Sequence, residues 1–476
     1  MFLSKMQKGL LLFLLLVLAI LTGAAVPLFH TPVLTEQTKQ QLDCQQFYAE
    51  EPGADRAMLL EQNGTAWTER LRLLNQAQEQ IVLTTFDMRD SHSTRDITAV
   101  LLQKANDDVS VKILVDGLNG WFHLEQSPLF RALAAHPNIE IKLYNPVHVA
   151  RLWLNQYRLH DKFVIVDDLG YILGGRNTHD YFIGDYDTDS RSLDREVLVY
   201  NTRQHTARSG ESSIAQLQQY FDTMWNSDYC KHYGEKDAPS QQQEKLWWEL
   251  EAHYNQLVQQ HAVLFQDNDF MRRTVPANRI TLLYNNPDMV AKEPEIFYQL
   301  CRLMGQAQEQ VTFFSPYAIC NQYMINALQQ ISAQVPDCRL VINSVENGDN
   351  FFASADYLRH KADVLQSGFA VYEYDGGTST HGKSLTIDNR LSVIGSYNLD
   401  LRSTYLSTET MVVIDSTELT AQLNQNFHAM EQDSRQLIGP DDYIVPDNVR
   451  VADVSTLKRV LWKVVGVVVQ PFRLML

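Results

Sequence analysis

The chain carries the string HDKFVIVD at residues 160–167 and the string HGKSLTID at residues 381–388. In both strings a His is followed two positions later by a Lys, and five positions after the Lys by an Asp. After six further residues, each copy has a pair of small residues, one variable residue and then an Asn. Two copies with the same internal spacing indicate a duplicated unit and not a chance match. The repeated residues are His160, Lys162, Asp167, Gly174, Gly175 and Asn177 in the first copy and His381, Lys383, Asp388, Gly395, Ser396 and Asn398 in the second.

A duplicated set of His, Lys and Asn is suited to holding a phosphodiester from two sides. One His can attack phosphorus while the other protonates the leaving oxygen. Lys and Asn side chains can donate hydrogen bonds to the phosphoryl oxygens and to the charge that develops on them. The sequence contains no HExxH string, no clustered Cys/His spacing and no P-loop lysine, so we expect neither a metal nor another cofactor.

The motifs also predict local structure. Residues 162–166 and 383–387 are predicted strands, each followed by a tight turn and a return strand at residues 171–173 or 391–394. Each His and Lys would then stand at the start of a strand, where a spacing of two places both side chains on one face. The Asn follows the return strand and comes back near the His. The Asp lies at the far end of the first strand, so we interpret it as a residue that holds the turn.

The duplication extends beyond the motifs. The string QAQEQ occurs at residues 76–80 and 306–310, each time between an amphipathic stretch and an apolar run. Strands alternating with helices predict a βαβ-type sheet in each half. The matched strands are residues 81–86 and 311–314, 111–115 and 339–342, and 139–144 and 370–374; the matched helices are residues 96–106 and 322–334.

The overall charge limits the classes of partner. The 476-residue chain has a formal net charge of -17 and 45% hydrophobic residues. A nucleic-acid-binding protein usually shows a basic face, so the acidic balance argues against nucleic acid as a partner. An acidic protein also gains no general attraction to anionic lipid, so attachment to a membrane must come from apolar segments.

The N-terminus supplies such a segment. An uncharged and almost wholly apolar run extends from Gly9 to Phe29, and Lys5 and Lys8 precede it. About 20 residues suffice to span a bilayer, and the lysines favour a cytoplasmic N-terminal end. We therefore expect a single-pass anchor in the cell membrane with the remainder of the chain on the extracytoplasmic side. The small residues 23–25 leave a cleaved signal peptide as the alternative.

We divide the chain into five segments. These are an anchor or signal at residues 1–30, a first α/β domain at 45–235, a helical linker at 236–270, a second α/β domain at 271–440 and a tail at 441–476. From Leu457 the tail mixes a Trp and basic residues with apolar ones. That composition fits either a helix lying at a membrane interface or a helix that closes the core.

Five cysteines form no metal-binding spacing, and their odd number leaves at least one unpaired within a monomer. Their spacing does not define disulfide pairs. Most are interpreted as small buried apolar residues.

The duplicated H-x-K-x4-D-x6-G-[GS]-x-N pattern resembles the phospholipase D superfamily over roughly residues 60–415. The resemblance implies an α/β fold with two pseudo-symmetric phospholipase-D-like mixed α/β sandwich domains that share one active site, here with an N-terminal transmembrane helix. Narrower features resemble the cardiolipin-synthase branch of that family. They are the YNP string at residues 144–146, Arg158 two positions before the first motif His, and the NLDLRS string at 398–403.

The resemblance also implies roles for single residues. His160 is assigned as the nucleophile that becomes a phosphohistidine, and His381 as the general acid and then the general base. Family members orient each His with a carboxylate that follows the Asn. Glu409 is the candidate in the second half, and Asp194 is the candidate in the first half with Glu196 as its rival.

The function implied by the resemblance is that of a membrane-associated phosphatidyltransferase, similar to cardiolipin synthases and acting on phosphatidylglycerol or a similar phospholipid. A hydrolytic phospholipase D, in which water takes the second step, uses the same residues and stays open. A phosphodiesterase acting on nucleic acid is a weaker alternative because of the acidic balance and the anchor. The sequence does not define an oligomeric state.

Overall fold

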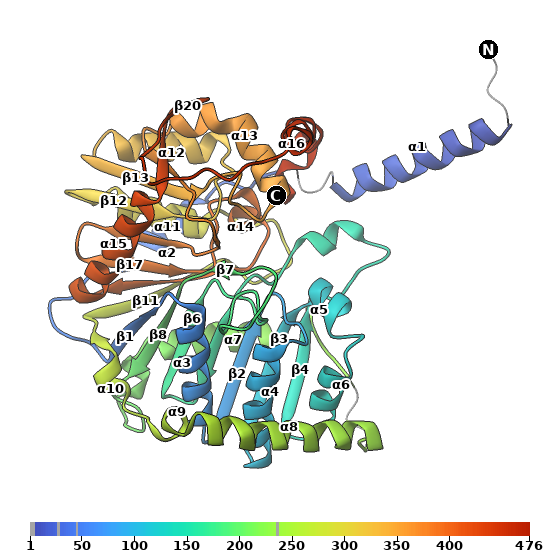
Figure 1. Ribbon diagram of the computed structural model, residues 1–476, viewed down its shortest axis with the longest axis vertical. Coiled ribbons are helices and arrows are strands. Elements are labelled where there is room, and N and C mark those ends of the chain that lie inside the picture. The colour runs from blue at the N-terminus through green and yellow to red at the C-terminus, as the bar shows by residue number, and fades with distance from the viewer. Residues whose placement is uncertain (1–4, 26–28, 44–45, 235–237) are drawn as a thin grey trace.

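The computed structural model describes residues 5–25, 29–43, 46–234 and 238–476. Cys44 and residues 26–28 of the predicted apolar run lie outside these ranges. Two nine-stranded sheets form the frame, one in each half of the chain, and they lie one above the other in Figure 1.

The two sheets have corresponding strand orders. Apart from β10 at an edge of the first sheet and β20 at an edge of the second, they match strand for strand. In each, three neighbouring strands are parallel and the others are antiparallel. This is the predicted pair of pseudo-symmetric mixed α/β units. The first order is β10 (Val275–Pro276), β1 (Asp55–Leu60), β8 (Glu196–Asn201), β6 (Gly170–Gly174), β5 (Phe163–Val166), β2 (Gln80–Thr85), β3 (Ser110–Asp116), β4 (Ile139–Tyr144) and β9 (Cys230–His232). The second is β11 (Arg279–Tyr284), β18 (Thr410–Asp415), β17 (Leu391–Gly395), β16 (Ser384–Ile387), β12 (Gln310–Phe314), β13 (Asp337–Asn343), β14 (Ala370–Tyr374), β19 (Ser434–Gly439) and β20 (Asp442–Ile444).

Helices complete each half. Those of the first half are α3 (Asn63–Asn75), α4 (His92–Asn106), α5 (Gly117–His123), α6 (Pro128–Ala135), α9 (Ala262–Gln266) and α10 (Phe270–Arg273). The segment predicted as a helical linker holds α8 (Gln241–Gln260), which packs against α4 and α6. Those of the second half are α2 (Glu36–Asp43), α11 (Glu295–Met304), α12 (Gln322–Ser332), α13 (Phe351–Leu365) and α14 (Leu401–Tyr405).

Most predicted elements lie close to their predicted bounds, and the first predicted helix differs for a visible reason. The helix expected from residue 96 begins at His92. The carboxylate of Asp180 accepts hydrogen bonds from the backbone N–H of His92 at 3.1 Å and of Ser93 at 2.7 Å. A distant side chain thus stabilises the first turn, which local sequence does not reveal.

The motif strands also begin slightly later than predicted. β5 starts at Phe163 and β16 at Ser384, directly after the motif lysines. The His and Lys residues therefore lie in the segments that lead into the strands. There each His contacts the other half of the molecule, whereas the carbonyl of each Lys still accepts from the backbone N–H at the end of its return strand.

The two sheets share a core. Apolar residues of both sheets meet α7 (Ile214–Trp225) and α15 (Thr417–Gln432) in one buried cluster. Phe163 from β5 and Phe314 from β12 belong to this cluster, and the Phe314 ring stacks on that of Phe427 with 5.8 Å between ring centroids. Separate clusters fill the outer side of each half. The halves are therefore joined by a hydrophobic interface that neither can bury alone.

The N-terminal helix α1 (Lys5–Ala25) projects from this body (Figure 1) and contacts it at the short helix η2 (Leu152–Gln156). The segment Met6–Gly23 is long and apolar enough to cross a membrane, and none of this segment is buried against the protein.

The four cysteines within the described residues are free thiols, and three of them are buried.

The tail closes the second half. Helix α16 (Thr456–Val468) packs on α13, with Trp462 1% exposed and its ring 6.1 Å from that of Phe351. The short helix η4 (Gln470–Met475) then packs against α14.

We expect Phe314→Ala to lower the free energy of unfolding by about 3–5 kcal/mol, since it opens a cavity in the shared core. Both halves should lose structure in one transition. Urea titration in mild detergent, with hydrogen exchange read separately in β5 and β16 peptides, measures this. Trp248→Ala is the matched control because Trp248 is exposed, and it should change stability by about 0.5 kcal/mol or less. Destabilisation of β16 with β5 unchanged would contradict the shared core.

Candidate active site

The segments that carry the motif histidines pair with the opposite half of the chain. Residues 158–160 run beside Thr408, whose N–H donates to the Arg158 carbonyl at 2.9 Å and whose Oγ1 accepts from the His160 N–H at 3.1 Å. In the second half, β15 (Ser379–Thr380) pairs in parallel with β7 (Ser192–Leu193). The His381 N–H then donates to the Leu193 carbonyl at 2.6 Å. Each motif His is thus fixed to a segment of the other half.

The carboxylates follow the same crossing. His160 Nδ1 lies 2.8 and 3.0 Å from the two carboxyl oxygens of Glu409. His381 Nδ1 lies 2.7 Å from Asp194 Oδ2. Each predicted carboxylate therefore holds the histidine of the opposite half. Because Nδ1 is occupied in both rings, Nε2 is the nitrogen left for a substrate.

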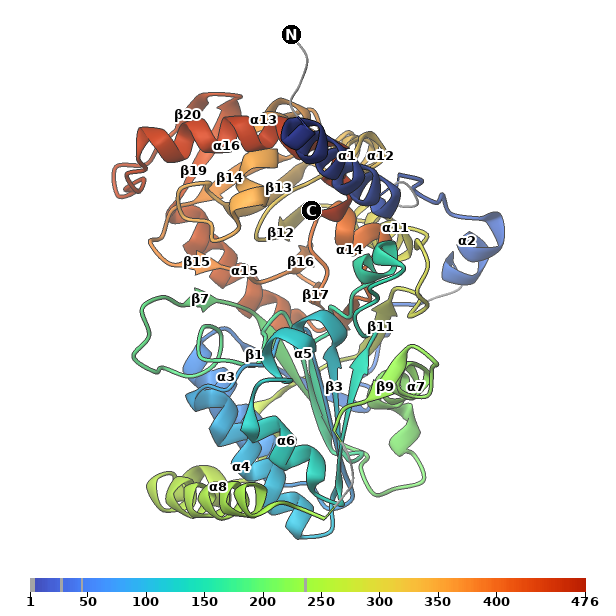
Figure 2. The ribbon, with the colours of Figure 1, turned by 90° about the vertical axis from the view of Figure 1, so that its right-hand side faces the viewer.

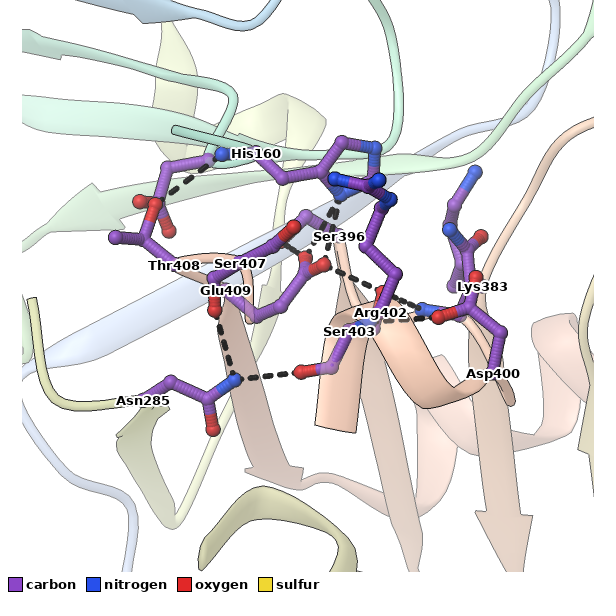
Figure 3. A network of polar contacts seen from close by, with 12 residues as sticks. His160, Asn285, Lys383, Ser396, Asp400, Arg402, Ser403, Ser407, Thr408 and Glu409 are labelled. Carbon is purple, nitrogen blue, oxygen red and sulfur yellow. Dashed lines mark hydrogen bonds and ion pairs between the residues drawn. The ribbon is translucent and has the colours of Figure 1, made fainter. Parts of the chain in front are cut away.

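Further hydroxyl groups fix Glu409 (Figure 3). Ser396 Oγ donates to Glu409 Oε2 at 2.5 Å, and Ser403 Oγ donates to Oε1 at 2.6 Å. Asn285 holds the same loop, because its amide donates to the carbonyls of Ser403 and Ser407. The Glu409 carboxyl group is fully buried, so these hydrogen bonds define its orientation.

The first half has a different arrangement at the corresponding position. A Cβ atom on Gly175 would lie 2.2 Å from Asp194 Oδ1, so the glycine makes room for the carboxylate. The Arg195 N–H donates to the same oxygen at 2.7 Å. Gly175 and Ser396 occupy equivalent motif positions, yet one provides space and the other provides a hydroxyl group.

Glu196, the rival of Asp194, has another role. Its Oε1 accepts from Arg70 at 2.6 Å, and its Oε2 lies 3.4 Å from Arg176. This ion-pair cluster is buried behind the site. The geometry therefore favours Asp194 as the partner of His381.

The motif lysines are buried beside the histidines. Lys162 Nζ donates to the His160 carbonyl at 2.5 Å, and Lys383 Nζ donates to the His381 carbonyl. Burial lowers the pKa of Lys162 to about 7 and that of Lys383 to about 8. An anion placed between them would restore their usual preference for the charged form.

A cavity of about 330 Å³ lies between the halves and is lined by both motif histidines and both motif asparagines. The side-chain oxygens of Asn177 and Asn398 are buried and find no hydrogen-bond partner within the described residues. These oxygens can accept a hydrogen bond from a ligand, whereas a phosphoryl oxygen would be held by the NH2 group of the same amide. Apolar side chains, among them Phe86 and Phe352, line the same cavity.

The two histidines differ in their electrostatic surroundings. Burial, followed by the charges of Lys162 and Lys383, lowers the pKa of His160 well below its usual value. Burial and Lys383 also lower the pKa of His381, but Asp194 opposes this shift.

The carboxyl groups that hold the two histidines also differ. Burial raises the pKa of Glu409 well above its usual range. Burial acts in the same direction on Asp194, yet Lys383 and His381 outweigh it and hold the Asp194 pKa below its usual value. Asp194 is thus the more firmly ionised carboxylate.

The motif aspartates lie away from the cavity, in the turns predicted for them from the sequence. The carboxylate of Asp167 accepts from the backbone N–H groups of residues 78, 79 and 80 at 2.6–3.0 Å. Asp388 does the same for residues 308, 309 and 310 at 2.8–3.2 Å. Both residues adopt a positive φ, +46° and +50°. They anchor the far end of each motif hairpin to the repeated QAQEQ string.

Some residues of the site were not predicted from the sequence. Asp116, at the end of β3, accepts from Arg158 Nε at 2.8 Å and from the Leu159 N–H at 3.1 Å, which fixes the chain just before His160. Phe86 and Phe182 pack on the His160 and His381 rings, with centroids 5.0 and 5.1 Å apart. The position of Asp116 directly after an apolar strand was a usable signal, whereas the two Phe residues resemble ordinary core residues.

Comparisons with known proteins agree with this arrangement. The family model described as "Cardiolipin synthase, PLD-like domain" matches residues 71–225 and 300–431, and each range holds one motif. Cardiolipin synthase C of Escherichia coli (strain K12) is 24% identical over 427 residues, which cover 81% of this chain and 87% of that protein. Cardiolipin synthase 1 of Bacillus cereus is 25% identical over 425 residues, which cover 86% and 73%.

A solved structure shows the same fold over nearly the whole chain. Phosphatidylserine synthase of Haemophilus influenzae Rd KW20 superposes with a TM-score of 0.63 at 14% sequence identity. The superposition covers 93% of this chain and 99% of that one.

The lysine environments predict pH-dependent anion binding. We expect sulfate to bind in the cavity with an affinity that falls about tenfold or more as the pH rises from about 6 to about 9. Lys162 and Lys383 lose their charges in that range, and a charge-assisted hydrogen bond contributes about 1.5–3 kcal/mol. Sulfate stays a dianion throughout, so calorimetric titration reports the protein groups alone.

Lys383→Met should weaken sulfate binding at pH 6 and flatten its pH dependence. Lys104→Met, which alters a partly exposed lysine in the last turn of α4, is the matched control. An affinity that does not change with pH in the unmodified protein would contradict the assignment of these pKa values to the anion site.

Proposed function

This chain belongs to the phospholipase D superfamily, in its cardiolipin-synthase-like branch, and on that premise we propose that it is a phosphatidyltransferase. Its donor would be a glycerophospholipid such as phosphatidylglycerol, and its acceptor the hydroxyl group of a second lipid. The product would be a cardiolipin-type lipid.

The main support for this activity is the arrangement of the two motif histidines. Two histidines from different halves line a single cavity, each held at Nδ1 by a carboxylate of the opposite half. Such a pair can act on one phosphorus atom, with one histidine as the nucleophile and the other as the proton donor to the leaving oxygen. The lysines and asparagines of both motifs provide donors for the phosphoryl oxygens.

In the first step His160 Nε2 attacks the phosphorus of the donor lipid. The bond from phosphorus to the head-group oxygen breaks, and His381 gives its Nε2 proton to that oxygen. A phosphatidyl group is then bound to His160, and the head-group alcohol leaves. The lowered pKa of His160 supports this choice because the attacking ring must be neutral.

In the second step His381 accepts the proton of the acceptor hydroxyl group. The acceptor oxygen attacks phosphorus, the bond to His160 Nε2 breaks, and both histidines return to their starting states. The ionised Asp194 supports His381 in this role, since it stabilises the imidazolium that gives up its proton in the first step and forms again in the second.

The proposed activity is tested by supplying purified protein in mild detergent with phosphatidylglycerol alone, with and without EDTA. Cardiolipin and free glycerol in equal amounts are the expected products. Phosphatidic acid with glycerol would identify hydrolysis instead, because water would then have taken the second step. Heat-treated protein is the blank.

His160→Ala and His381→Ala should each lower kcat by about 10²-fold or more, because either change removes a group that moves a proton or bonds to phosphorus. Circular dichroism should show that both variants stay folded. His205→Ala is the matched control because His205 is exposed and outside the cavity. A variant of either motif histidine with near-normal kcat would exclude the two-histidine mechanism.

We further propose that α1 spans the membrane and that both halves lie on the extracytoplasmic side. The length of the apolar segment supports a membrane span. The flanking lysines support the orientation, because they favour a cytoplasmic N-terminal end. Protease added to intact spheroplasts of an expressing bacterium should then digest the two halves. Full protection until lysis would place them in the cytoplasm. Recovery of a protein that starts near Val26 would show a cleaved signal on the same side of the membrane.

A further inference from the structure

Helix α16 has a second apolar face that nothing in the described structure covers. Leu457, Val460, Leu461 and Val464 are 69%, 51%, 44% and 54% exposed, and Val467 and Val468 continue the row. Spacings of three and four residues place these side chains on one side of a helix. Six large apolar side chains on one helix form an exposed stripe that a soluble surface rarely carries.

The opposite face of α16 is already used. Trp462 is buried against α13, and a Cβ atom on Gly466 would lie 2.5 Å from the Ala355 carbonyl oxygen. The exposed stripe is therefore not a core face left open by a poorly placed helix. Contacts of Trp462 and Gly466 with α13 fix the position of α16, and the opposite face of the helix is exposed.

The same element continues into the active-site cavity. After α16 the chain enters η4, and Met475 and Leu476 line the cavity beside the motif histidines. Arg402 fixes this end, because its Nε donates to the Met475 carbonyl at 2.8 Å and its N–H donates to the Leu476 carbonyl at 3.2 Å. The outer stripe and the cavity wall thus belong to one continuous segment.

Other exposed apolar side chains occur on this side of the molecule. Figure 2 shows α16, α5 and the C-terminal end together on the face turned to the viewer. Trp121 and Phe122 on α5 are 52% and 54% exposed. Phe352, which lines the cavity, is 54% exposed. Exposed apolar side chains of α5 and α16 are therefore found on the face that carries the C-terminal end, whose residues Met475 and Leu476 line the cavity.

Helix α1 leaves the body on this face. Figure 1 shows α1 from the side, projecting outward beside α16, whereas α16 is seen end-on; Figure 2 shows α16 along its length. The two helices thus run in clearly different directions. A bilayer crossed by α1 would meet α16 lying along its surface, which is how an amphipathic interfacial helix binds.

We propose that α16 is a membrane-docking helix, whose outer stripe (Leu457, Val460, Leu461, Val464, Val467 and Val468) inserts into the bilayer that α1 spans and holds the cavity mouth against the lipid surface. Lipid would then reach the motif histidines along η4 without crossing water. The access of lipid rests on the proposed phosphatidyltransferase activity, whereas the docking rests on the proposed membrane span of α1.

Charge favours a lipid surface as the occupant. Arg459 and Lys463 lie on α16 beside the stripe, in a chain whose formal net charge is -17. Basic residues that flank an apolar stripe suit the head-group region of a bilayer. Helix α1, which is long and apolar enough to cross a membrane, projects beside α16, so a bilayer crossed by α1 would lie next to this stripe.

The docking is tested on the full chain in nanodiscs of phosphatidylethanolamine and phosphatidylglycerol, with a photo-crosslinking residue at position 464. The matched control carries it at position 248, because Trp248 is 73% exposed but lies on α8 in the first half. We expect lipid-mass adducts at position 464 and about tenfold fewer at position 248. Equal yields at both positions, or adducts of position 464 with protein only, would overturn the proposal.

A second measurement tests the access of lipid. Val464→Glu should lower turnover of bilayer phosphatidylglycerol by about tenfold or more and leave turnover of a dispersed short-chain analogue unchanged. Trp248→Glu should change neither rate. Equal loss on both substrates would mean that Val464 has only a structural role and would overturn the proposal. If no substrate is turned over by the unmodified chain, the proposed function fails, while the crosslinking result still decides the docking.

Discussion

The site depends on two crossed contacts between the halves of the chain, His160 with Glu409 and His381 with Asp194. Each contact joins a histidine to a carboxylate that the other half supplies. Neither half alone can orient its own histidine, so the fold must bring residues 187 and 249 positions apart in sequence into hydrogen-bond distance. The shared hydrophobic core and the short pairings of β7 with β15 and of Leu159 with Thr408 maintain that geometry.

The pseudo-symmetry is broken where the chemistry requires two different groups. Gly175 makes space for Asp194, whereas Ser396 donates a hydroxyl group to Glu409. The resulting environments favour ionisation of Asp194 and oppose that of Glu409. Two histidines of one repeated motif can thus take different roles, because their partners and not their own sequences set their protonation.

The sequence predicted the repeated strands, the motif residues and the turn position of Asp167 and Asp388, because these follow from local spacing and alternation. It did not predict that Glu409 and Asp194 cross between the halves, since that contact depends on how two folded units dock. Spacing left Glu196 as a rival of Asp194. In the structure Asp194 contacts His381, whereas Glu196 is paired with Arg70 and Arg176. The tail was ambiguous because α16 is apolar on both sides, one packed on α13 and the other exposed.

The most direct test of a single site with two distinct histidines is to map the covalent intermediate. Protein mixed with phosphatidylglycerol, quenched within one turnover and digested at a pH that preserves phosphohistidine, is analysed by mass spectrometry. We expect a phosphatidyl group on His160 and none on His381. A group on His381 with none on His160 would reverse the roles, and groups on both histidines would contradict a single asymmetric site.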